Sequence, residues 1–169
     1  VGNWGSRYML AKKFNEDGFA FKYDPTNAMI MVVDGGTQVE QIPTLKEISG
    51  GKYIRDKAIE FASQSNSDAN PLDTAHEINR KLGNNISQFH PSISFKPDSL
   101  NTPYGSLGIA SINNSTVSTA NAGDVFILGI KKDNVQVLLT KDDVFKKDQQ
   151  TLKTAADLAA KYRISVREV

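Results

Sequence analysis

Apolar residues in the first part of this chain follow the period of β-strands in two consecutive segments. Alternate positions from Phe19 to Tyr23 are aromatic, which is typical of a strand with one buried face. The run from Met29 to Val33 is continuously apolar, so it predicts a strand, Ala28 to Asp34, that is buried on both faces. Asp24 to Asn27 lies between the two segments, contains a proline and predicts a tight turn. We therefore expect the two segments to pair as antiparallel strands.

The middle of the chain changes to the helical period. Lys52 to Ser65 carries apolar residues at helical spacing, and this spacing places Arg55 on the outer side of the predicted helix. Asn70 followed by a proline is a strong helix start, and the apolar stripe after it predicts a second helix that ends near Ser87. His90 to Pro103 is a loop of a length that is often found in flaps and binding loops.

The second half returns to short strands before a final helix. Turn-forming pairs rich in Asn, Asp and Gly separate the apolar segments, which predicts an antiparallel meander. The four predicted strands are Leu107 to Ile112, Thr116 to Ala122, Val125 to Ile130 and Val135 to Thr140. Lys147 to Tyr162 has helical spacing, and part of Val1 to Lys13 is interpreted as a further strand. Because strands and helices are segregated, the sequence predicts an α+β fold in one domain, residues 1–169.

Composition excludes several functional classes. The chain has 169 residues, 39% hydrophobic and 23% charged, which is ordinary for a soluble globular domain. Its net charge of +1 gives no reason to expect nucleic acid or an acidic membrane as a partner. The sequence contains no apolar run of membrane-spanning length, no signal peptide pattern and no cysteine. We expect a cytoplasmic protein whose metal ligands, if it has them, are carboxylates and backbone oxygens.

Acidic residues stand at the ends of the first two predicted strands. Glu16 and Asp17 precede the first strand, and Asp34 ends the second. If these strands are antiparallel neighbours, the three side chains come together at one edge of a sheet. Carboxylates held there suit a hard divalent cation, although an Asp followed by glycine at a strand end is most often only a turn.

The order of four short motifs resembles a known family. Asn15-Glu16-Asp17 is followed by Val33 to Gly36, then by Ala120 to Asp124, then by Val135 to Asp143. In this order the motifs resemble the type 2C (PPM) metal-dependent serine/threonine protein phosphatases, including their bacterial-type members. The resemblance covers roughly Lys12 to Asp143.

The resemblance implies a fold, a reaction and cofactors. The expected fold is an antiparallel β-sandwich flanked by helices, in four αββα layers, here lacking the usual C-terminal portion. The expected reaction is hydrolysis of phosphoserine or phosphothreonine in a phosphorylated protein substrate, as in signalling, by a metal-activated water. Two or more Mn²⁺ or Mg²⁺ ions are implied, because paired cations acidify a shared water and neutralise phosphate oxygens. The oligomeric state is left open.

The resemblance also assigns roles to individual residues. Asp34 bridges two metals and is the main catalytic anchor, and the carbonyl of Gly35 is a further ligand. Glu16 and Asp17 hold metal-bound waters, and Asp124 lies near a further, weaker metal position. Lys12 occupies the place of a phosphate-binding arginine and is the second catalytic candidate.

The chain also departs from the family pattern. Gly36 stands where some relatives have a histidine. Lys12 replaces the usual arginine, so the bidentate hydrogen bonding of a guanidinium to phosphate is lost. The two C-terminal aspartate motifs of the family are absent from the sequence. The chain is therefore interpreted as a truncated or a degenerate member. The alternatives are a catalytically weak or inactive regulatory binding module, and an α+β domain with an unrelated role.

Overall fold

The computed structural model describes residues 15–36, 48–93 and 102–140, together with short stretches between 149 and 161. Lys12, most of the loop from His90 to Pro103 and much of the predicted C-terminal helix lie outside the described residues. The predicted strand before Lys13 lies outside them as well.

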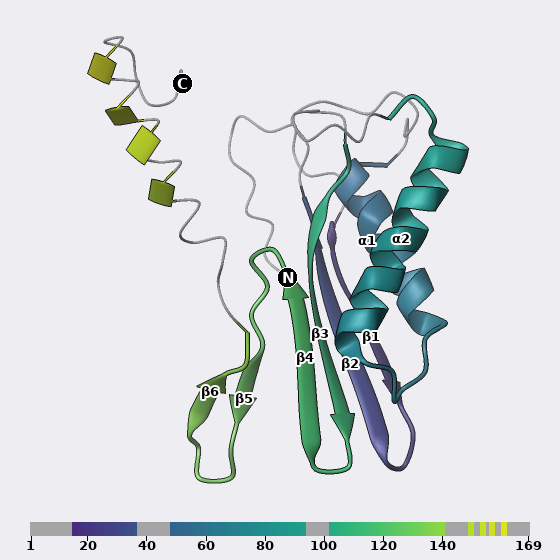
Figure 1. Cartoon of the computed structure of the whole chain (residues 1–169), viewed down its shortest axis with the longest axis vertical. Coiled ribbons are helices and arrows are strands. Elements are labelled where there is room, and N and C mark those ends of the chain that lie inside the picture. Colours follow the sequence, from purple (N-terminus) through teal and green to yellow (C-terminus); the bar gives the residue numbers. More distant parts are fainter. Residues whose placement is uncertain are drawn as a thin grey trace.

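A four-stranded antiparallel sheet forms the centre of the fold (Figure 1). Its strands are β1 (Asp17–Tyr23), β2 (Asn27–Gly35), β3 (Gly105–Asn113) and β4 (Thr116–Ala122), and they lie side by side in this order. The predicted pairing of the first two segments is confirmed, with Asp17 opposite Asp34 and Tyr23 opposite Ala28. Strands that follow each other in the sequence are thus neighbours throughout this sheet, and the connection from β2 to β3 contains the two helices.

Asp24 fixes the turn between β1 and β2. Its Oδ1 accepts hydrogen bonds from the backbone N–H groups of Thr26 (2.8 Å) and Asn27 (2.9 Å). Its other oxygen accepts from the Ser67 hydroxyl, which lies in the connection between the helices. The Ser67 hydroxyl and then the Thr26 N–H hold the pKa of Asp24 well below its usual range, because both stabilise the charged form.

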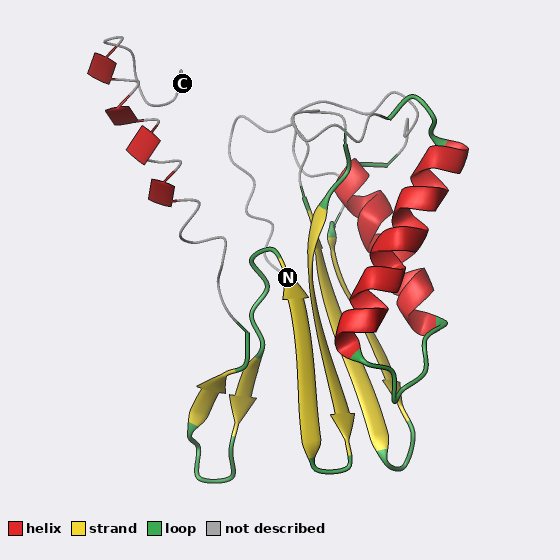
Figure 2. Ribbon diagram, in the orientation of Figure 1, coloured by secondary structure: helices red, strands yellow, loops and turns green. Residues whose placement is uncertain are grey.

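Two helices cover one face of this sheet (Figure 2). Helix α1 spans Gly50–Ser63, two residues earlier than expected, because the Ser49 hydroxyl accepts from the Lys52 N–H (3.1 Å) and caps it. Helix α2 spans Pro71–Phe89 and begins as predicted, with the Asn70 side chain accepting from the Leu72 N–H (2.9 Å). Its last turn runs past Ser87 and ends where the His90 N–H bonds the Ile86 carbonyl.

The core lies between the helices and the two central strands, β2 and β3. Every second side chain of β2 points into it, and the helices contribute the facing residues. Its buried members are Met29, Met31, Val33, Ala58, Phe61, Ala62, Ile78 and Ile109.

The prediction that the second strand is buried on both faces is wrong. Met29, Met31 and Val33 are buried, whereas Ile30 and Val32 on the other face are 39% and 38% exposed. None of the described helices or strands packs over that second face, so a sandwich of two stacked sheets is not seen within the described residues. A continuous apolar run indicates that both faces suit burial, but it does not supply the element that would cover the second one.

The predicted four-strand meander is also only partly correct. Strands β5 (Leu128–Ile130) and β6 (Gln136–Leu138) form a separate two-stranded sheet beside β4, as Figure 1 shows. Gly123 adopts a φ of +84°, in the left-handed region that favours glycine, and there the chain leaves β4. This turn replaces the hairpin that would have joined β4 to β5.

Candidate functional site

Two of the predicted acidic residues face each other at one end of the sheet. Asp17 of β1 is the register partner of Asp34 of β2, and Asp34 is in turn opposite Ser106 of β3. Directly paired residues of an antiparallel sheet project from the same face, with Cβ atoms about 4.5–5.5 Å apart. Both aspartates are exposed, on the face opposite the helices. The hairpin therefore brings Asp17 and Asp34 together, as expected from the sequence.

This pairing places two carboxylates of like charge side by side. Like charges directly opposite each other on neighbouring strands destabilise a sheet. Among the described residues, no ion pair or side-chain hydrogen bond engages the Asp17 carboxylate. A cation placed between the two carboxylates would convert the repulsion into attraction.

Glu16 does not join this pair. Its side chain is only 3% exposed and lies on the helix side of the sheet, since a Cβ added at Gly51 would stand 2.8 Å from the Glu16 Cδ. Successive side chains leave an extended backbone in opposite directions, so Glu16 and Asp17 point to different faces. All three acids therefore lie at one edge of the sheet, as expected, where the Glu16 carbonyl accepts from the Gly35 N–H (3.0 Å), but the Glu16 side chain points to the face opposite Asp17 and Asp34.

Asp124 lies at the same end of the sheet but further along it. Its backbone N–H donates to the Ser106 Oγ (3.4 Å), and Ser106 is the neighbour of Asp34 on β3. Gly123 lies so close to this serine that an added Cβ would stand 2.2 Å from Oγ. Since strands are spaced about 4.8 Å apart, Asp124 is roughly two strands from Asp34.

The two glycines after Asp34 are fixed by close contacts. A Cβ at Gly35 would lie 2.2 Å from the Gly51 carbonyl oxygen, so the first turn of α1 packs directly on the end of β2. The Gly36 N–H donates to the Tyr104 carbonyl (2.9 Å), and a Cβ at Gly36 would overlap the Tyr104 ring. The glycine found where some phosphatases have a histidine therefore has a steric reason in this chain.

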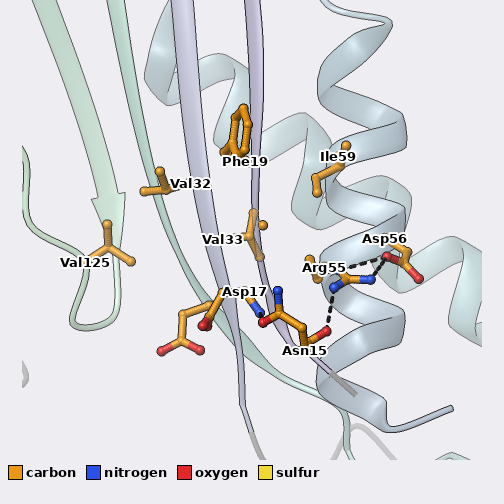
Figure 3. Close-up of a pocket in the computed structure, with 11 residues that line it drawn as sticks. Asn15, Asp17, Phe19, Val32, Val33, Arg55, Asp56, Ile59 and Val125 are labelled. Carbon is orange, nitrogen blue, oxygen red and sulfur yellow. Dashed lines mark hydrogen bonds and ion pairs between the residues drawn. The ribbon is translucent and has the colours of Figure 1, made fainter. Parts of the chain in front are cut away.

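A solvent-open pocket of about 650 Å³ adjoins the paired aspartates (Figure 3). Apolar side chains such as Phe19, Val32 and Val125 form much of its wall, and Arg55 and Asp56 of α1 add charge. The helical period had placed Arg55 on the outside, but its side chain is only 16% exposed. Only the tertiary packing of α1 on β1 reveals its place at the site, so no sequence motif could have identified it.

The oxygen ligands at this end of the sheet are of the kind that hard divalent cations prefer. The described residues contain no group of three or more His, Cys, Asp or Glu side chains arranged to hold a metal. Mg²⁺, however, keeps several waters and is usually held by one or two carboxylates together with substrate phosphate. Asp17 and Asp34 fit that pattern, whereas the Gly35 carbonyl oxygen lies against helix α1, 2.8 Å from the position of a Cβ at Gly51.

Comparisons with known proteins leave the family open. No family model matches the chain, and no curated protein sequence matches it. Among solved structures, a crystal structure of RsbX in complex with magnesium aligns with a TM-score of 0.44 and 13% identity, over 79% of this chain and 55% of that one. The chain thus spans about half the length of that protein. A TM-score below 0.5 establishes neither a shared fold nor a shared activity, so the site is interpreted from its own residues. No helix in the described part of the chain is long and apolar enough to cross a membrane.

Proposed function

We propose that this protein is a metal-dependent phosphatase that hydrolyses phosphoserine or phosphothreonine in proteins. The observation that supports the proposal is the in-register pair of Asp17 and Asp34, exposed on one face of the sheet beside an open pocket. Two carboxylates at this spacing favour a bound cation, and the pocket has room for a phosphorylated side chain.

Each residue has a defined task in this proposal. Asp17 and Asp34 hold Mg²⁺ or Mn²⁺, and Asp124 serves a further, more weakly held ion. When bound, such ions supply an acidified water and neutralise the phosphate charge. The buried Glu16 supports the backbone from which Asp17 projects, and Lys12 contacts the phosphate. The protein acts in the cytoplasm.

Substitution of Asp34 tests the enzyme proposal. We expect Mn²⁺ or Mg²⁺ to be required for hydrolysis of p-nitrophenyl phosphate and of a phosphothreonine peptide, and Asp34→Asn to abolish both activities. Asp73→Asn is the matched control, because Asp73 is an exposed aspartate in the first turn of α2, far from the pair in the chain. A wild-type protein that neither binds Mn²⁺ in calorimetry nor releases phosphate would overturn the proposal.

The second candidate is a regulatory binding module with weak or no catalysis. The observation that favours it is the lack of a three-acid group among the described residues. This candidate predicts that the wild-type protein binds Mn²⁺ or a phosphopeptide in calorimetry without measurable turnover. Turnover that depends on Asp34 would exclude it.

A further inference from the structure

Arg55 connects helix α1 to the segment in front of β1. Its Nη1 donates a hydrogen bond to the Asn15 carbonyl, forty residues earlier in the chain. Its Nε and Nη2 both donate to Oδ1 of Asp56, with an Nε–Oδ1 distance of 2.8 Å. Figure 3 shows the guanidinium held between these two partners at the wall of the pocket.

The same short segment is held at two further points. The Asn15 Oδ1 accepts from the Asp17 N–H (3.1 Å), and the Glu16 carbonyl accepts from the Gly35 N–H (3.0 Å). Both carbonyls that precede Asp17 are therefore bound by another element, one by α1 and one by β2. The backbone just before Asp17 is therefore held by helix α1 through Asn15 and by strand β2 through Glu16.

Gly18 lets Arg55 come this close. A Cβ at Gly18 would lie 2.8 Å from the Arg55 Cγ and 2.6 Å from the Ile59 Cδ1. A larger residue would displace the side chains of Arg55 and Ile59 and so disturb the hydrogen bond from Arg55 to the Asn15 carbonyl. The glycine after the acidic pair therefore belongs to the same arrangement.

We propose that Arg55, oriented by Asp56, is a positioning residue that holds Asn15 to Asp17 so that the Asp17 carboxylate faces Asp34. Its consequence for metal affinity rests on the proposed function, whereas its effect on the backbone does not. Three of the five N–H donors of the guanidinium are already engaged, and its charge is paired with Asp56. Arg55 thus acts through Asp17 and does not serve as the main phosphate ligand.

The first measurement is made on the metal-free protein. Arg55→Met keeps the unbranched stem and removes all the donors, so we expect faster hydrogen exchange at the Asp17 amide, and a smaller acceleration in Asp56→Asn. Lys57→Met is the matched control, because Lys57 lies on the same helix and pairs with Glu60 at 2.8 Å, away from Asn15. Unchanged exchange at Asp17 in Arg55→Met would overturn the proposal.

The second measurement separates positioning from phosphate contact. We expect Arg55→Met to weaken Mn²⁺ binding in calorimetry by about 10- to 100-fold, as is typical when a residue supporting a ligand is lost. The KM for p-nitrophenyl phosphate at saturating Mn²⁺ should stay unchanged. A raised KM with unchanged Mn²⁺ affinity would instead make Arg55 a substrate contact and overturn the proposal.

The same experiments also cover a variant that fails to fold and a wild-type protein that binds no metal. If Arg55→Met does not fold, Arg55→Lys replaces it, because lysine keeps one charged donor group. An exchange rate at the Asp17 amide that is faster than in the wild type, but slower than in an unprotected amide, supports the positioning role. A rate equal to that of the wild type overturns it. If the wild-type protein binds no Mn²⁺, the proposed function fails, and the exchange experiment still decides whether Arg55 positions Asp17.

Discussion

Single residues at the acidic end of the sheet are selected by the space around them. Gly35 touches the backbone of Gly51, and Gly36 lies against the Tyr104 ring, so neither position has room for a side chain. In the sequence, an Asp followed by glycine at a strand end most often indicates only a turn. The glycines after Asp34 are in fact required by the close approach of a helix and a loop, which no local pattern in the sequence could have indicated.

Two alanine substitutions test this steric argument at the residue scale. Gly35→Ala places a Cβ 2.2 Å from the Gly51 carbonyl oxygen, so backbone must move, and we expect a loss of about 2–3 kcal/mol in the free energy of unfolding. Gly83→Ala, in helix α2 with nothing within 4 Å of the added Cβ, should stabilise by about 0.5–1 kcal/mol. Urea titrations give both values. Equal effects at the two positions would contradict the close contact at Gly35.

At the scale of elements, the β1–β2 hairpin was the most predictable part of the fold. Alternating aromatic residues, a turn that contains proline and a strand that ends in two glycines predict both strands. They also predict that the start of β1 lies beside Asp34 at the end of β2. The two helices followed from Asn70 and from apolar spacing. Two missed features, the open face of β2 and the departure of the chain at Gly123 beside Ser106, depend on parts of the chain that are distant in sequence. The opposite directions of Glu16 and Asp17 are local and follow from the alternation of side chains along an extended backbone. The hairpin also contacts the helical layer, because Asp24 accepts from Ser67.

Acid should weaken this hairpin through Asp24. The folded-state pKa is depressed below the ordinary 3.8, so its stabilising effect is complete above that value and is lost as pH falls through the folded-state pKa. We expect Asp24→Asn to lower the urea midpoint at pH 7 and the difference from wild type to shrink steadily below about pH 4. Ser67→Ala should show a smaller change of the same sign. A pH-independent difference would show that Asp24 acts only through its shape.

At the scale of the whole molecule, one face of the sheet is covered and the other is open. The helices bury Met31 and Val33, whereas Phe19, Phe21 and Tyr23 project from the opposite face and remain largely exposed. The segregated α+β class was predictable from the order of the elements, and the coverage of the second face was not, because apolar periodicity is the same whether or not a partner element is present. The sandwich expected from the family resemblance remains a prediction.

One substitution on each face of the sheet compares how much the covered face and the open face contribute to the free energy of unfolding. Met31→Ala, at a position only 1% exposed, should cost about 2–5 kcal/mol of unfolding free energy. Phe21→Ser, on the open face where the ring stacks on Tyr23, should cost no more than about 1 kcal/mol. Both values come from urea titration followed by circular dichroism. A large loss in Phe21→Ser would show that something covers this face in solution.

The buried position of Glu16 links the site to the folding of helix α1. Helix N-termini carry partial positive charge and are stabilised by a nearby acid, yet α1 has no acidic residue in its own first turn. The Glu16 carboxyl carbon lies 2.8 Å from the position of a Cβ at Gly51, so the segment before β1 places a carboxyl group beside that first turn. The helix therefore depends on the segment that carries Asp17, and Arg55 on the same helix holds that segment in return. Helix and acidic segment are thus expected to form together in folding and to lose their order together when either is disturbed.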